Sequence, residues 1–304
     1  MSRQIDTMHM PLKRRNMKVV IVSASRAMQM LGYSPYHMKE VLLHGSGHMK
    51  VLIEAIRAEH NRFSGIQRYR KEDYAKWFAN YDVSRVHRLT QRVQSLTGPQ
   101  CLIEVPFFMG SEAIEAYVDD PDVKFILTER DPDRWVSSIN NTVAGVVQMA
   151  SAFPIRLLKH FNDDLYYFFL LNELIYASIS DCTLPGDAEN RPNMRRNYMS
   201  YIAMVKRTVP SDRLCQIQLE NGLGWNEICP FLGIDVPDEE YPRGNEPAKF
   251  QALVGDWLRP RMASAALKLA GLVTVSATAG AGLWVCRKTV KAAVSTGLAA
   301  LSRP

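Results

Sequence analysis

An arginine and a serine eight residues apart are the side chains of this sequence best suited to chemistry. In residues 125–138, FILTERDPDRWVSS, an apolar run ends just before Arg130, Asp131 can cap a helix, and Pro132 suits the first helical position. Ser138 then lies two helical turns beyond the cap, on roughly the same face. A guanidinium fork beside a hydroxyl suits a phosphate monoester. The alternative is that Arg130 pairs with an acid at the strand end and Ser138 is an ordinary helix serine.

The elements that must position this pair alternate along the chain. Apolar runs typical of buried strands are followed by helical patterns, which predicts βαβ units and a parallel sheet covered by helices on both faces. The predicted strands are 18–22, 101–105, 123–128 and 214–219, and the predicted helices are 72–78, 111–117, 132–149, 155–179 and 194–207. In such sheets ligands bind beyond the carboxyl ends of the strands, where Arg130 is expected.

Composition and charge narrow the class of protein. The chain has 304 residues, 47% of them hydrophobic, enough for one large core. Its five cysteines form no CxxC pair, and residues 1–16 lack the apolar segment of a signal peptide, so we expect reduced thiols and a disordered basic leader. Residues 1–18 carry five lysines and arginines against one acid, and 252–304 carry seven against one. The stretch between is net negative, which argues against a nucleic-acid partner and places the positive charge where it could face anionic lipid.

Several blocks of the sequence, in order, resemble a known family. They are LGYSPYHMKEV (31–41), WFANYD (77–82), IEVPFF (103–108), VKFILTERDPDRWVSS (123–138), VPSDRL (209–214) and GWNEICPFLGIDVPDEEYPRGNE (224–246). Together they resemble the P-loop sulfotransferase-like family common in fungi, from residue 18 to about 250. The resemblance implies a three-layer α/β/α fold with a parallel sheet. It also implies sulfuryl transfer from 3′-phosphoadenylyl sulfate (PAPS), without a metal, to a hydroxyl of a small metabolite.

The same resemblance implies roles for individual residues. Arg130 and Ser138 correspond to the pair that holds the 3′-phosphate of the nucleotide, and Arg26 to the arginine of the phosphate loop on the 5′ side. The proton acceptor would be Glu104, where relatives usually have aspartate, or His37 in the PYHM block, although a lone histidine is more often structural. Residues 165–171, LYYFFLL, would either line a pocket for a lipophilic acceptor or form helix core.

The chain departs from the family pattern in two places. Where relatives read G-L-P-R-T-G-T-T-S-L-K, this chain reads SASRAMQMLG and lacks about eight residues of the turn whose N–H groups would cradle a phosphate. Residues 83–100 form an insertion, either a translated intron or a surface loop, because removing them leaves the continuous NYDCLIEVPFF. Two functions therefore stay open: a sulfotransferase, or a catalytically degenerate member that acts as a membrane-tethered binding or scaffolding protein.

The C-terminal tail, residues 251–304, contains a candidate membrane span. Residues 269–286, LAGLVTVSATAGAGLWVC, are uncharged between Lys268 and Arg287. As a helix they would be about 27 Å long, close to the hydrocarbon thickness of a bilayer at about 30 Å. We expect a single-pass membrane helix with the α/β domain, residues 17–250, in the cytoplasm. A core helix or an amphipathic surface helix is the alternative.

Overall fold

The computed structural model describes residues 19–21, 25–60, 100–103, 107, 110–242 and 246–301. Its strands form one five-stranded sheet in the order β2-β3-β1-β4-β5, and every neighbouring pair is parallel. The strands are β1 (Val19–Ile21), β2 (Ser34–Tyr36), β3 (Gln100–Ile103), β4 (Lys124–Glu129) and β5 (Leu214–Gln218). The predicted α/β class and parallel sheet are confirmed.

Helices pack on both faces of the sheet, because alternate residues of each strand point to opposite sides. Ile126 and Ile217 pack against α2 (Ser25–Met30) and α14 (Trp225–Leu232). Phe125 precedes Ile126 by one residue on β4, and Leu214 precedes Ile217 by three residues on β5. Both side chains therefore lie on the opposite face, where they pack against α8 (Ser111–Val118) and α13 (Asn190–Thr208). The burial of β4 on both faces explains its continuous apolar sequence.

A second, helical core lies beside the sheet. Its helices are α3 (Met38–His44), α4 (Ser46–His60), α10 (Val143–Ser151), α11 (Ile155–Leu158), α12 (Asp163–Ser180) and the first turns of α15 (Glu246–Leu301). Phe168 and Phe169 of α12 are buried in this core, so most of the aromatic run is helix core, as the second of the two alternatives predicted. Tyr166 remains exposed.

Two predicted helices are each divided in the structure. The helix predicted over 132–149 ends at Asn140 of α9 (Pro132–Asn140) before α10 begins, and the Thr142 hydroxyl donates to the Ser138 carbonyl at the break. The helix predicted over 155–179 is divided into α11, the 3₁₀ turn η3 (Lys159–Phe161) and α12, because the side chain of Asn162 caps the N-terminus of α12. Polar side chains that bond to the nearby backbone favour such ends over helix interiors.

The sequence pattern missed strand β2 and placed several strand boundaries one residue away from their observed positions, among them the start of β3. Pro35 cannot donate to a ladder, but β2 is an edge strand, where proline is tolerated. Gln100, assigned to the predicted insertion, pairs with Ser34 as the first residue of β3. Residues 83–99 of that insertion, the predicted helix 72–78 and the leader 1–16 lie outside the described residues.

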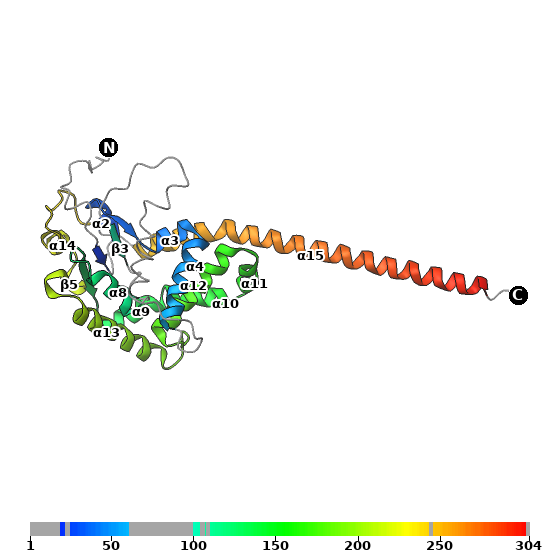
Figure 1. Ribbon diagram of the computed structural model, residues 1–304, viewed down its shortest axis with the longest axis horizontal. Helices are drawn as coiled ribbons and strands as arrows, with labels where there is room; N and C mark the ends of the chain where they lie inside the picture. Colours follow the sequence, from blue (N-terminus) through cyan, green and yellow to red (C-terminus); the bar gives the residue numbers. More distant parts are fainter. Residues whose placement is uncertain are drawn as a thin grey trace.

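The long helix α15 leaves the body beside α11 and then continues alone (Figure 1). Its first turns are tied to the body: the Trp257 indole donates to the Leu42 carbonyl at 3.0 Å, and Arg261 pairs with Asp164 at 2.9 Å. Ala265 is buried, whereas the described side chains from Ala270 onward are exposed. Within the described chain, one helix segment, residues 251–291, is long and apolar enough to cross a membrane.

Candidate functional site

The turn between β4 and α9 has the predicted construction. Strand β4 ends at Glu129, Arg130 follows it, and the Asp131 carboxylate accepts a hydrogen bond from the Arg134 N–H at 2.9 Å. Pro132 occupies the first turn of α9, where its missing N–H costs nothing. The predicted cap is confirmed, and it places Arg130 at the carboxyl end of a strand next to the centre of the sheet.

Arg130 and Ser138 line the same hollow, which has a volume of about 720 Å³. The residues that line it come from the strand end, α9, the turn after α9, and α15: Arg130, Asp133, Arg134, Ser137, Ser138, Asn141, Thr142 and Gln251. Among the described residues, neither the Arg130 guanidinium nor the Ser138 hydroxyl has a hydrogen-bond partner. The neighbouring Ser137 hydroxyl is occupied, because it donates to the Asp133 carbonyl at 2.8 Å.

The two acids next to Arg130 in sequence, Glu129 and Asp131, both have other partners. Glu129 pairs with Lys206 of α13 at 2.8 Å, and in the described part of the chain the Arg130 guanidinium forms no ion pair. Glu220, in the turn η5 (Leu219–Asn221) after β5, accepts a hydrogen bond from the Asp131 N–H at 2.9 Å. This bond lowers the pKa of Glu220 below its usual value, and the nearby Arg134 and Arg130 lower it further. The guanidinium of Arg130 thus remains available to a ligand anion.

A buried tyrosine fixes the backbone of Arg130. The Tyr198 hydroxyl of α13 accepts from the Arg130 N–H at 2.9 Å and donates to the Arg130 carbonyl at 3.2 Å. Its ring stacks on Trp135, with centroids 4.7 Å apart and an angle of 19° between the planes. Burial raises the pKa of Tyr198, so the hydroxyl keeps the proton that it donates. One side chain therefore satisfies both polar groups of the residue at the strand end.

Two of the other predicted site residues, Arg26 and His37, are described by the structure, and neither lines this hollow. Arg26 is exposed at the start of α2. His37 is the N-cap of α3: its Nδ1 accepts from the Lys39 N–H at 3.3 Å, while Glu40 accepts from the His37 N–H at 3.1 Å. Glu104 and residues 22–24 of the shortened phosphate loop lie outside the described residues.

A histidine pair sits at the start of the helical core. His44 and His48 stack with ring centroids 4.3 Å apart, and Nδ1 of His48 lies 2.9 Å from the Tyr36 hydroxyl. Burial, with a smaller contribution from His44, lowers the pKa of His48 to about 4. Over the described ranges, histidine, cysteine, aspartate and glutamate side chains form no group of three that could hold a metal ion.

Of the eight residues that line the hollow, sequence reasoning named two, Arg130 and Ser138, and missed six, among them Arg134, Asn141 and Gln251. Arg134 and Asn141 could have been found, because they lie one turn before Ser138 and three residues after it along the same helical pattern. Gln251 carries no local signal, since α15 reaches the hollow only through the packing of the whole domain.

Comparison with known proteins identifies the family to which the chain belongs. Residues 22–250 match the sulfotransferase domain family. Ava biosynthesis cluster protein M from Aspergillus versicolor is 27% identical over 237 residues, which cover 74% of this chain and 80% of that protein. A crystal structure of a sulfotransferase from Alicyclobacillus acidocaldarius matches 81% of this chain and 93% of its own, with 15% identity and a TM-score of 0.34. Since the family match spans most of the chain, this protein belongs to the sulfotransferase domain family.

Proposed function

We propose that the protein binds a 3′-phosphoadenosine nucleotide through Arg130 and Ser138 and transfers a sulfuryl group from PAPS to a hydroxyl of a lipophilic small metabolite. The observation that carries this proposal is a guanidinium and a hydroxyl, both without a partner among the described residues, in one hollow at the carboxyl edge of the parallel sheet. A phosphate monoester has the charge and the acceptor oxygens to match both groups. The packing of helices on both sheet faces supports the three-layer fold of this family.

Each residue of the site has a defined task in this proposal. Arg130 binds two phosphate oxygens through its fork, Ser138 donates to a third, and Tyr198 keeps the peptide of Arg130 in place. PAPS, when bound, supplies the sulfuryl group, and we assign Arg26 to the 5′ side of the nucleotide. Glu104 is the first candidate to accept the acceptor's proton, because the ring of His37 already caps a helix.

Different observations support the proposed role in secondary metabolism and the proposed membrane span. A relative named as a biosynthesis cluster protein supports a small-molecule acceptor and a role in secondary metabolism. The apolar exposed part of α15 supports a single membrane span over 269–286, with the α/β domain on the cytoplasmic side and the basic residues at lipid headgroups. Anchoring at a membrane would bring the domain close to lipophilic acceptors.

Calorimetry with 3′-phosphoadenosine 5′-phosphate tests the proposed site in the full-length protein. We expect wild type to bind this nucleotide at least tenfold more tightly than AMP, because a charge-assisted bond contributes about 1.5–3 kcal/mol. Arg130→Ala should abolish the preference, and Ser138→Ala should reduce it. Arg207→Ala, at an exposed arginine of α13, and Ser137→Ala, at a hydroxyl already bonded within the protein, are the matched controls. Equal affinity of the wild type for both nucleotides would refute the site.

A second candidate function is nucleotide binding without transfer. The sequence after β1 reads SASRAM, with no glycine and no tandem threonines, so it lacks the loop that holds a 5′-phosphosulfate in relatives. The two functions are separated by measuring transfer of radiolabelled sulfate from PAPS to a panel of hydroxylated lipophilic acceptors. Binding of the nucleotide with no labelled product would support the binding protein.

A further inference from the structure

The exposed part of α15 begins where the helix leaves the body, with no spacer between them. Ala265 is buried in the helical core and Leu269 packs partly against it, while the side chains from Ala270 onward are exposed. The uncharged run also begins at Leu269, directly after Lys268. If this run crosses a bilayer, the surface of the body next to Leu269 must lie at the level of the lipid headgroups.

That surface is formed by the segment from Met149 to His160, which we name the α11 corner. Ile155 and Leu158 of α11 share the helical core with Ala265, and Figure 1 shows α11 beside α15 at the point where the helix leaves the body. Ala150 is also buried and Lys159 is half-buried, while the other side chains of the corner are exposed. Phe153 is 85% exposed, Leu157 44% and Met149 40%. Large apolar side chains this exposed, grouped at one corner, are typical of an interaction surface.

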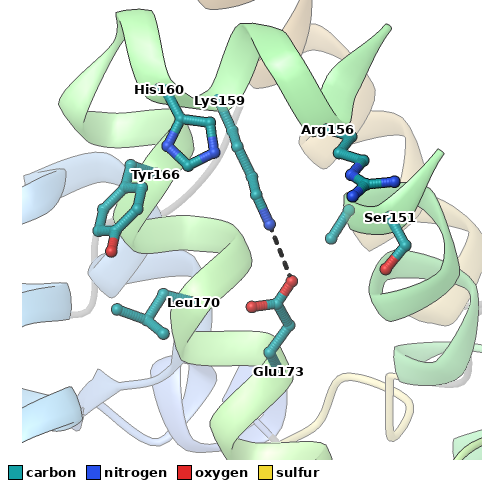
Figure 2. A pocket seen from close by; sticks show the side chains of 8 residues that line it. Ser151, Arg156, Lys159, His160, Tyr166, Leu170 and Glu173 are labelled. Atoms are coloured by element: carbon teal, nitrogen blue, oxygen red, sulfur yellow. Dashed lines mark hydrogen bonds and ion pairs between the residues drawn. The ribbon is translucent and has the colours of Figure 1, made fainter. Parts of the chain in front are cut away.

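A cationic hollow of about 520 Å³ opens beside these apolar side chains (Figure 2). Arg156 lies on one side of it, and Lys159 and His160 lie on the other. Lys159 pairs with Glu173 at 3.0 Å, whereas the Arg156 guanidinium has no partner among the described residues. Tyr166, an aromatic residue with a polar end, lines the same hollow. This combination of apolar, cationic and tyrosine side chains matches the interface of a bilayer with anionic headgroups.

We propose that the α11 corner lies on an anionic membrane surface and orients the sulfotransferase domain on the bilayer that α15 spans. Phe153 and Leu157 enter the interfacial region, and Arg156 binds a lipid phosphate from the mouth of the hollow. This inference rests on the membrane anchoring included in the proposed function. The domain is then held at two places, the helix and the corner, so it cannot rotate freely about α15.

The test uses the full-length chain reconstituted into vesicles of phosphatidylcholine and phosphatidylserine. Phe153→Cys carries an environment-sensitive nitrobenzoxadiazole fluorophore, in a background with Cys182→Ser, Cys215→Ser and Cys286→Ser. The substitution at position 153 should not disturb folding, because the side chain is almost fully exposed. The matched control carries the label at Met199→Cys, an exposed position on α13, which Figure 1 shows farther from the projecting end of α15 than α11. A third protein has only Cys182→Ser and Cys215→Ser and carries the label at the native Cys286 of the apolar helix.

We expect nitroxide-labelled lipids to quench the fluorophore at 153 and at 286 but not at 199. Quenching at 286 with none at 153 would overturn the α11 corner while leaving the membrane helix intact. No quenching at 286 would overturn both. Arg156→Glu, combined with the label at 153, should reduce quenching in phosphatidylserine-containing vesicles to the level in phosphatidylcholine alone. Unchanged quenching in that variant would refute the role of Arg156.

Discussion

Replacing Tyr198 by phenylalanine removes one hydroxyl and leaves both polar groups of the Arg130 peptide without their partner. The hydroxyl now accepts from the N–H at 2.9 Å and donates to the carbonyl at 3.2 Å, and the ring below it would stay stacked on Trp135. The change therefore tests the hydrogen bonds rather than the packing. Because Arg130 stands between β4 and α9, a displaced peptide would also move its guanidinium out of line with Ser138.

The size of the effect follows from the groups left unbonded. A polar group that loses its partner costs about 1–3 kcal/mol, and the lower half of that range applies here because water can reach the turn. We expect the free energy of unfolding to fall by about 1–2 kcal/mol, which corresponds to a Tm lower by roughly 2–8 °C for a domain of this size. The Kd for 3′-phosphoadenosine 5′-phosphate should rise about three- to tenfold, since a tenfold change equals about 1.4 kcal/mol.

Calorimetry and thermal unfolding of the full-length protein measure both quantities. Tyr201→Phe is the matched control: it removes a hydroxyl three residues further along α13 that forms no hydrogen bond with the described residues. We expect it to leave both the Kd and the Tm close to wild type. If Tyr198→Phe and Tyr201→Phe behave alike, the Tyr198 hydroxyl does not hold Arg130 in place, and this reasoning is refuted.

Three other predictions concern stability. Asp164→Asn should lower the free energy of unfolding by about 1 kcal/mol, measured by chemical denaturation, because the partly exposed ion pair with Arg261 attaches α15 to the body. Tyr176→Phe should cost about 1–2 kcal/mol by the same measurement, since the hydroxyl joins α9 to α13 through Asn140 and Asn190. The free energy of unfolding should fall as the pH drops from about 6.5 to about 4, because in this range His48 is protonated in the unfolded chain and neutral in the folded chain. In His48→Gln the free energy of unfolding should fall less over the same range.

Local sequence signals were sufficient for the part of the fold that carries the site. The apolar run of β4, the cap at Asp131 and the proline at position 132 are contiguous, so their pattern alone gives the strand, the turn and the helix. The edge strand β2 has no such pattern, because its three residues become a strand only when Gln100 to Leu102 of β3 offer a partner. The end of α9 at Asn140 and the start of α12 after Asn162 involve individual side-chain bonds that periodicity does not record.

The same contrast between local sequence signals and tertiary contacts applies to the candidate site. Arg130 and Ser138 were paired from spacing, and the structure places both at one hollow. Tyr198 lies 68 residues from Arg130 in sequence, and no motif links the two. Gln251 reaches the hollow from a helix that the sequence had assigned to the tail. Residues that hold other residues in place come from tertiary packing, so sequence reasoning found the residues proposed to bind the ligand but not their supports.

The path of α15 also constrains how an acceptor can reach the site. Gln251 lines the hollow and Leu269 marks the point where the helix leaves the body, so about 18 residues, or about 27 Å of helix, separate the two. In the proposed function the hollow holds the 3′-phosphate, and the sulfuryl group lies at the 5′ end of the same nucleotide, one nucleotide length away. That length is shorter than the helix between Gln251 and Leu269, so if α15 spans a bilayer from Leu269, a headgroup fixed there is too far from the sulfuryl group to react. A small lipophilic metabolite, in contrast, can concentrate in the membrane, leave it beside the domain that the proposal anchors there, and diffuse that distance. The geometry thus favours a freely diffusing acceptor over a membrane lipid, and a transfer assay should show labelled product with small hydroxylated metabolites and none with vesicle lipids.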